Sequence, residues 1–244
     1  MKIILCGASG RMGREIAREI INSKDMQLVA GVDKTPHSLD CAYYPNIADV
    51  KEQADVIIDF SHHSGTYQLV DFAASRHIPL VIATTGQNKE EIEYIKKAAQ
   101  SLPIFMSGNM SLGVTLFISV VAKIAGMFPY ADVEIIETHH NQKADAPSGT
   151  ALMLASSVLE ARNFEGRIVT DSRSGVRQKG DIGISSVRIG GEIGTHEVRI
   201  DTGFQSFTFK HEAHSRALFA IGAMHAIRFI VTQPNGLYSV KDFL

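Results

Sequence analysis

The chain has 244 residues, 45% of them hydrophobic, and a net charge of −2 from 24 basic and 26 acidic side chains. This length can bury one or two hydrophobic cores, and the lack of a basic excess argues against a nucleic-acid partner. No apolar stretch approaches the roughly 20 residues that span a bilayer, and the N-terminal apolar run is too short for a signal peptide. We therefore expect a cytoplasmic protein without a membrane partner.

Strand and helix patterns alternate through the first part of the chain. A continuous apolar run over residues 2–6 is typical of a strand covered on both faces, and a glycine-rich turn separates it from a helix predicted over 14–22. Further strands are predicted at 27–33, 55–61, 79–84 and 104–106, and further helices at 65–76 and 89–100. Such alternation predicts an α/β fold with a Rossmann-type, doubly wound parallel sheet.

The pattern changes after residue 110. Helices are predicted over 112–127 and 150–159, with a strand over 133–138 between them. Later strands, predicted as antiparallel hairpins, cover 184–189, 196–201 and 204–211. We expect a second, smaller α+β domain over 111–216, and a helix over 217–231 that returns to the first domain, which then comprises 1–110 and 217–244.

The turn Gly7-Ala8-Ser9-Gly10-Arg11-Met12-Gly13 follows the first strand and opens the first helix. Glycines at this place let the backbone approach a pyrophosphate, which free N–H groups and the positive helix end stabilise. The GxxGxxG spacing differs from the common GxGxxG fingerprint, so a purely structural turn is an alternative. Asp33 ends the second strand 20 residues after Gly13, where a carboxylate accepts hydrogen bonds from ribose hydroxyls. Together these features predict a dinucleotide-binding domain.

The residues beside Asp33 bear on the choice of dinucleotide. Asp33 favours NAD because its charge repels a 2′-phosphate, whereas Lys34 and Arg11 could pair with that phosphate. Both cations could instead be solvated surface charges. We expect the protein to use NADH and NADPH.

Three further loops end strands of the same predicted sheet. Ligands of an open parallel sheet lie across the carboxyl ends of its strands, so we expect these loops to contact the cofactor, although each could be an ordinary turn. The expected contacts, besides Gly7, Ala8, Ser9, Gly10, Arg11, Met12, Asp33 and Lys34, are Phe60, His62, Ala83, Thr84, Thr85, Ser107, Gly108, Asn109 and Met110.

Residues 137–151 read ETHHNQKADAPSGTA and are the most specific feature of the chain. His139, His140 and Lys143 supply proton donors and cations, and the segment 147–150 predicts a helix start whose N–H groups could bind a carboxylate. Adjacent histidines on an extended segment point to opposite faces, there is no HExxH pattern, and Cys6 and Cys41 are distant in sequence. We therefore expect no metal site, no disulfide and no catalytic thiol.

This segment resembles the signature of the dihydrodipicolinate reductase family, E-x-H-H-x-x-K-x-D-A-P-S-G-T-A, at every fixed position. Residues 7–13 are similar to that family's GAxGRMG turn, and the resemblance extends through residues 188–191 and 214–216. Two positions depart from the pattern of many relatives. His62 stands where an arginine is common, and Met110 stands where phenylalanine is frequent; both bear on the choice between NADH and NADPH.

The resemblance implies a Rossmann domain completed by the C-terminal helix, and a second domain that binds substrate and builds a homotetramer through its sheet. It implies NADH or NADPH as reductant and a cyclic dicarboxylate, 4-hydroxy-tetrahydrodipicolinate or its dehydrated form, as substrate. The product would be tetrahydrodipicolinate, on the way to diaminopimelate and lysine. The implied catalytic residues are His139 and Lys143, and the implied substrate-binding residues are His140, Lys143, Ser148, Gly149 and Thr150.

Other functions remain open at this point. An aspartate-semialdehyde or homoserine dehydrogenase also joins a Rossmann domain to a second domain, but the former needs a cysteine nucleophile there, and both cysteines precede residue 42. A dinucleotide-sensing module without catalysis would bind NADH but would leave His139 and Lys143 without a role.

Overall fold

The computed structural model describes residues 1–36, 38–163, 166–170 and 175–243. The chain divides into two compact units: unit 1 comprises Met1–Ser111 and Arg216–Leu244, and unit 2 comprises Leu112–Ser215. These bounds differ by one residue from the expected ones. No helix among the described residues is long and apolar enough to cross a membrane.

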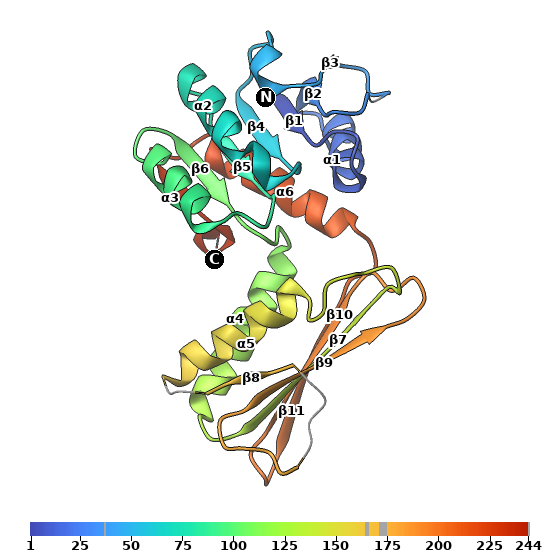
Figure 1. Cartoon of the computed structure of the whole chain (residues 1–244), viewed down its shortest axis with the longest axis vertical. Coiled ribbons are helices and arrows are strands. Elements are labelled where there is room, and N and C mark those ends of the chain that lie inside the picture. The colour runs from blue at the N-terminus through green and yellow to red at the C-terminus, as the bar shows by residue number, and fades with distance from the viewer. Residues whose placement is uncertain (37, 164–165, 171–174, 244) are drawn as a thin grey trace. The chain divides into compact units, whose positions relative to one another are not determined.

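Unit 1 contains one parallel sheet, which in the described residues has seven strands (Figure 1). They are β1 (Lys2–Cys6), β2 (Gln27–Val32), β3 (Ala42–Tyr44), β4 (Val56–Asp59), β5 (Leu80–Ile82), β6 (Pro103–Met106) and β12 (Gly236–Tyr238). The spatial order is β12-β6-β5-β4-β1-β2-β3, so the chain changes direction across the sheet between β1 and β4. This is the doubly wound order, and the switch point at β1 and β4 is where such sheets bind ligands. The two three-residue edge strands, β3 and β12, were not predicted from the sequence.

The helices of unit 1 cover the sheet and bury its apolar strands. They are α1 (Arg11–Asn22), α2 (Thr66–Arg76), α3 (Lys89–Ala98) and α6 (Ala217–Ile230), with the short 3₁₀ helices η1 (Ile47–Asp49), η2 (His63–Gly65) and η3 (Val240–Phe243). Strand β1 is buried from Ile3 onward, as its continuous apolar run predicted. Figure 1 shows α6 running along this sheet, and it packs against α1, β5 and β6 although it lies far along the chain from them.

Unit 2 has a mixed sheet with the order β11-β10-β7-β9-β8 in the described residues. Its strands are β7 (Asp132–His139), β8 (Ile168–Val169), β9 (Ile182–Arg188), β10 (Thr195–Asp201) and β11 (Ser206–Glu212). Strand β10 pairs antiparallel with β11 and β7, so the hairpin predicted there is confirmed. The hairpin predicted between β9 and β10 is wrong, because β9 pairs in parallel with β7 and β8.

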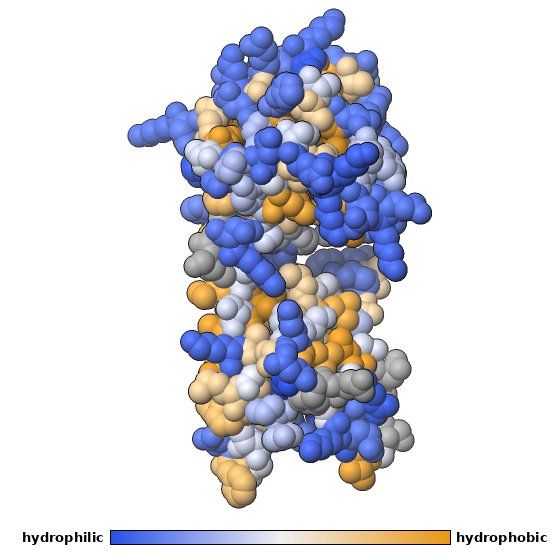
Figure 2. Space-filling model, turned by 90° about the vertical axis from the view of Figure 1, so that its left-hand side faces the viewer, coloured by the Kyte–Doolittle hydropathy of each residue, from blue (hydrophilic) through white to orange (hydrophobic). Residues whose placement is uncertain are grey.

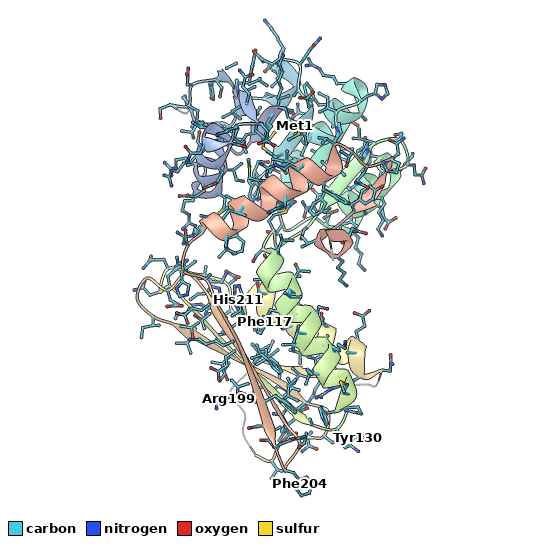
Figure 3. The ribbon with its side chains drawn as sticks, turned by 180° about the vertical axis from the view of Figure 1, so that it is seen from behind. Met1, Phe117, Tyr130, Arg199, Phe204 and His211 are labelled. Carbon is cyan, nitrogen blue, oxygen red and sulfur yellow. The ribbon has the colours of Figure 1, made fainter. Side chains whose placement is uncertain are left out.

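The sheet of unit 2 is covered by α4 (Leu112–Met127) and α5 (Gly149–Arg162), which lie side by side. Alternate residues of β7 are buried, as the period of two in a strand with one covered face requires. The rings of Phe117 on α4 and His211 on β11 lie 6.0 Å apart, whereas Arg199 points away from the helices (Figure 3). Among the described residues no helix covers the other sheet face, where Ser185 and Val187 of β9 are exposed.

Exposed apolar side chains are concentrated in unit 2. Phe204, at the tip of the β10–β11 hairpin, is fully exposed (Figure 3), and Leu116 and Val120 of α4 are 54% and 41% exposed. Figure 2 shows apolar patches among the polar side chains in its lower part, where unit 2 lies. Patches of this kind often mark contacts with another chain.

The packing of α6 on the loop after β6 can be tested with Gly222→Ala. In an open helix this change stabilises by about 1 kcal/mol, but here the new Cβ would overlap the backbone carbonyl of Met110. We expect a loss of about 1–3 kcal/mol instead, measured by urea unfolding. Ile221→Ala, at the neighbouring position that is 49% exposed, should change stability little. A raised stability of Gly222→Ala would contradict this packing.

Candidate active site

A cleft of about 730 Å³ in unit 1 opens at the carboxyl ends of β1, β2 and β4. It is lined by six of the residues predicted to contact a cofactor: Gly7, Gly10, Asp33, Lys34, Phe60 and His62. This volume and position suit one part of a dinucleotide, since ligands of doubly wound sheets lie at this switch point.

The glycine turn leaves no room for side chains. Gly7 has a φ of +79°, and a Cβ there would overlap the carbonyl of Phe60. A Cβ on Gly13 would overlap the carbonyl of Gly7. The backbone of β1, the turn and the β4 loop therefore approach each other as closely as a phosphate-binding turn requires.

Most N–H groups of the turn already have acceptors. Those of Gly7 and Ala8 donate to the carbonyl of Val32, and that of Gly10 donates to Gly7. Ala8 is also fully buried. Its N–H group already has an acceptor and its side chain cannot be reached, so the structure does not support the expected contact of Ala8 with a cofactor. In the described chain no side chain caps α1, and the first N–H groups of a helix lack acceptors within it. The amides of Arg11 and Met12 are therefore the best donors for a phosphate.

Asp33 is held in place at the end of β2. Its two carboxylate oxygens accept hydrogen bonds from the N–H groups of Ser9 at 3.0 Å and Thr35 at 3.1 Å. Each oxygen keeps a further lone pair for a ribose hydroxyl. Lys34 and Arg11 are both exposed, where they could reach a 2′-phosphate.

Two buried carboxylates, Asp59 and Glu91, form hydrogen bonds with the loops after β4 and β5. Sequence reasoning missed both of them. Asp59 accepts hydrogen bonds from the N–H and the hydroxyl of Ser61, and burial raises its pKa. Glu91 accepts from His63 at 3.1 Å and from the backbone of Asn88, in the capping box of α3. These bonds join the loop after β4 to the loop after β5.

The loops after β5 and β6 lie where the sequence predicted, at the carboxyl ends of their strands. Ala83, Thr84 and Thr85 follow β5; Ser107, Gly108, Asn109 and Met110 follow β6. Met110, however, is only 2% exposed, and its carbonyl lies against Gly222 of α6. Its side chain is part of the core of unit 1, so the expected cofactor contact by Met110 is not supported.

In unit 2, Glu137 is the centre of a polar network although it is completely buried. Arg188 donates two hydrogen bonds to it, at 2.9 and 2.8 Å, His139 Nδ1 lies 2.5 Å from it, and the N–H of Ser148 donates at 3.1 Å. Burial by itself raises the pKa of Glu137, but hydrogen bonds from Arg188, Ser186 and His139 outweigh it and lower the pKa to about 2. Sequence reasoning missed the roles of both Glu137 and Arg188.

Two histidines lie in contact beside this carboxylate. The rings of His139 and His196 are 5.2 Å apart, edge to face, and His196 Nε2 lies 2.9 Å from the hydroxyl oxygen of Ser148. Burial lowers the pKa of His139, an effect that Glu137 offsets only in part. Burial and the neighbouring His139 lower the pKa of His196 to about 4. At neutral pH both rings are therefore uncharged.

The predicted helix start is confirmed one residue earlier than expected. Ser148 is the N-cap of α5, and its hydroxyl oxygen accepts the N–H of Ala151 at 3.2 Å. Ser148 is only 2% exposed, so the protein already uses most of its hydrogen-bonding capacity. Gly149 is exposed and Thr150 is partly exposed at the same helix end, which favours anions.

Lys143 and His140 lie in the loop between β7 and α5. Lys143 Nζ is 2.8 Å from each carboxylate oxygen of Asp145, and its side chain is 22% exposed. His140 is partly exposed, and its carbonyl accepts the N–H of Lys143. Within the described ranges, no group of three or more potential metal ligands is close enough to hold an ion.

Family models match both parts of the chain. One described as dihydrodipicolinate reductase, N-terminus, matches residues 1–110, and one described as dihydrodipicolinate reductase, C-terminus, matches residues 113–244. The chain belongs to the dihydrodipicolinate reductase family. The expectation from residues 137–151 is therefore confirmed.

Individual members of the dihydrodipicolinate reductase family align along the whole chain. The 4-hydroxy-tetrahydrodipicolinate reductase of Caldanaerobacter subterraneus subsp. tengcongensis is 40% identical over all of this chain and 98% of its own length. That of Alkaliphilus metalliredigens is also 40% identical, over all of this chain and 99% of its own. A solved structure, the dipicolinate-bound dihydrodipicolinate reductase from Paenisporosarcina sp. TG-14, is 27% identical with a TM-score of 0.84, and the match covers all of this chain and 99% of the other.

The buried ion pair of this dihydrodipicolinate reductase family member can be tested with Glu137→Gln. The amide keeps the shape but leaves Arg188 without a counter-charge, so we expect unit 2 to lose about 3–5 kcal/mol in urea unfolding at pH 7. Asp25→Asn is a matched control, because Arg228 binds Asp25 through two contacts of 3.0 Å and both side chains are largely exposed. Equal effects of the two substitutions would contradict the role given to burial.

Proposed function

We propose that the chain is a 4-hydroxy-tetrahydrodipicolinate reductase. It is an NAD(P)H-dependent oxidoreductase of diaminopimelate and lysine biosynthesis, which reduces its substrate by way of dihydrodipicolinate to tetrahydrodipicolinate. The observation that carries this proposal is the segment 137–151 in a chain whose relatives of that name align over its full length. In the structure this segment supplies a lysine, two histidines and a helix start within one unit.

The residues of unit 1 fit a nicotinamide dinucleotide. The crowded glycine turn and the amides of Arg11 and Met12 would hold the pyrophosphate, and Asp33 would hold the ribose. When bound, the reduced nicotinamide supplies a hydride. The loops after β5 and β6 would line its ring. Lys34 and Arg11 would pair with the 2′-phosphate of NADPH, and Asp33 would hold the free ribose hydroxyls of NADH.

The substrate is a ring with two carboxylates, so unit 2 has to hold negative charge. His140, Lys143 and the N–H groups of Gly149 and Thr150 would bind these carboxylates, because hydrogen-bond donors, an ammonium group and a helix N-terminus all favour anions. The hydroxyl group of Ser148 can take part in three hydrogen bonds, and its contacts with Ala151 N–H and with His196 use two of them. Ser148 would bind the substrate through the third. The dipicolinate that the Paenisporosarcina protein binds carries the same pair of carboxylates.

Reduction also requires a proton, for which His139 and Lys143 are the proposed sources. The lowered pKa of His139 leaves its ring neutral without substrate, so Lys143 is the first candidate. A dianion that approaches His139 would raise its pKa and could make it a second donor. Glu137 fixes the ring by its bond to Nδ1, which leaves Nε2 for proton exchange.

The open sheet face of unit 2 suits a homotetramer. A sheet face without a covering helix, with Ser185 and Val187 exposed on it and a fully exposed Phe204 at a hairpin tip, offers surface that other copies could bury. We propose that four copies associate through this face and that the enzyme works in the cytoplasm.

The proposed function is tested by the loss of absorbance at the reduced nicotinamide band when a synthase generates the substrate from pyruvate and aspartate semialdehyde. We expect oxidation of NADH and of NADPH, each dependent on the synthase. Binding of NADH without any oxidation would instead support a sensing module and overturn the proposal.

Lys143→Ala tests the proton donor. General acid catalysis by a side chain raises a reaction rate about 10²- to 10⁴-fold, so turnover should fall by a factor in that range. The affinity for NADH should stay unchanged, because Lys143 belongs to unit 2. Lys123→Ala, at an exposed position of α4, serves as the control. Turnover equal to that of the unmodified protein would remove Lys143 from the mechanism.

A further inference from the structure

The carboxylate of Asp145 forms the same ion pair with Lys143 that a substrate carboxylate would form. Both of its oxygens lie 2.8 Å from Lys143 Nζ, which is the contact that a bound carboxylate would make with the same ammonium group. The hydrogen bond from Lys143 lowers the pKa of Asp145, so this carboxylate is charged at neutral pH. In the structure Lys143 is therefore already paired with an anion that belongs to the chain.

The backbone on both sides of this ion pair is fixed. Arg188 Nη2 donates to the carbonyl of Asp145 at 2.7 Å, and Arg188 is itself held by its two bonds to Glu137. The N–H of Lys143 donates to the carbonyl of His140 at 3.1 Å. The peptide groups are thus anchored by contacts that do not involve the carboxylate of Asp145.

The side chain of Asp145, by contrast, is free to leave. It is 62% exposed, and among the described residues its carboxylate is held by Lys143, by a hydrogen bond with its own backbone N–H, which moves with the residue, and by the charge of Arg188. A rotation of this side chain would place the carboxylate in water, where its charge is well solvated. It would release Lys143 without moving the anchored backbone.

We propose that Asp145 is an internal competitor for the substrate carboxylate at Lys143, and that it sets the affinity of the site for dicarboxylates. This inference rests on the proposed function, which gives Lys143 the task of binding a carboxylate. Each ligand that reaches Lys143 has to displace Asp145 first. Meanwhile the ion pair holds the ammonium group in one position until the ligand arrives.

The size of the effect follows from the exposure of the pair. Asp145 is 62% exposed and Lys143 is 22% exposed, so water still screens the pair. Pairs that water screens are weak, and their displacement costs a ligand about two- to fivefold in affinity. Asp145 therefore adjusts the affinity without blocking the site. A pair whose carboxylate is completely buried, such as Glu137 with Arg188, could not play this part, because breaking it is far more costly.

The experiment measures the affinity of Asp145→Asn for pyridine-2,6-dicarboxylate by calorimetry, with NADH present. We expect binding two- to fivefold tighter than that of the unmodified protein, whereas a merely structural role would leave it equal or weaker. Asp145→Glu, which keeps the charge, should restore the original affinity. Glu93→Gln removes an equal charge from an exposed pair with Lys96 in unit 1 and should change nothing.

A double variant separates displacement from simple charge repulsion. If Asp145 acts through Lys143, its replacement should no longer tighten binding once Lys143→Ala has removed the ammonium group. A gain that persists in the Lys143→Ala background would show repulsion and overturn the proposal, as would unchanged or weaker binding in the single variant. Failure of the proposed function would look different, because then the unmodified protein would neither bind this dicarboxylate nor oxidise NADH with substrate.

Discussion

The polar network around β7 in unit 2 depends on one buried charge, the carboxylate of Glu137. Glu137 has no exposed surface, and a carboxylate in that position is tolerated because Arg188, His139, Ser148 and Ser186 donate hydrogen bonds to it. These donors come from β9, β7 and the start of α5. The same ion therefore fixes the parallel pairing of β7 with β9, the orientation of the His139 ring and the first turn of α5. Each proposed substrate contact follows directly or indirectly from that arrangement.

The two proposed sites would bind two different anions by the same physical means. In unit 1 the strand β1 leads through the glycine turn into α1, and in unit 2 the strand β7 leads through the loop of His140 and Lys143 into α5. Both helices offer N–H groups and a positive end to a negative ligand. They differ in what surrounds that end. In the turn before α1 the backbone segments lie too close together for side chains, which would let a pyrophosphate approach, whereas the loop before α5 carries the ammonium group of Lys143, which would suit a compact dicarboxylate.

Burial divides the titratable groups of unit 2 into two kinds. His139 and His196 lie inside, have lowered pKa values and contribute hydrogen bonds of fixed direction. Lys143 is 22% exposed and Asp145 is 62% exposed, and they form the contact that we propose a ligand replaces. In the proposed mechanism Lys143 delivers the proton, with His139 as a second donor, and the contact of Lys143 with Asp145 is the one that a substrate exchanges, while Glu137 and Arg188 keep the geometry. An enzyme that must bind a dianion and release it again benefits from this separation, because only weak contacts need to break in each cycle.

The sequence alone determined the elements whose signals are local. The alternation of apolar runs predicted the parallel sheet of unit 1, and the glycine turn, Asp33 and residues 137–151 predicted the candidate site and the family, since these signals depend on neighbours within a few turns of chain. Only the tertiary structure decided which distant groups meet. Arg188 lies 51 residues from Glu137, and His196 lies 48 from Ser148, so no periodicity could pair them. The sequence also could not predict that β7 and β9 pair in parallel, or that Ala8 and Met110 are buried. Both features depend on contacts between segments that lie far apart in the chain, and a local sequence pattern contains no information about such contacts.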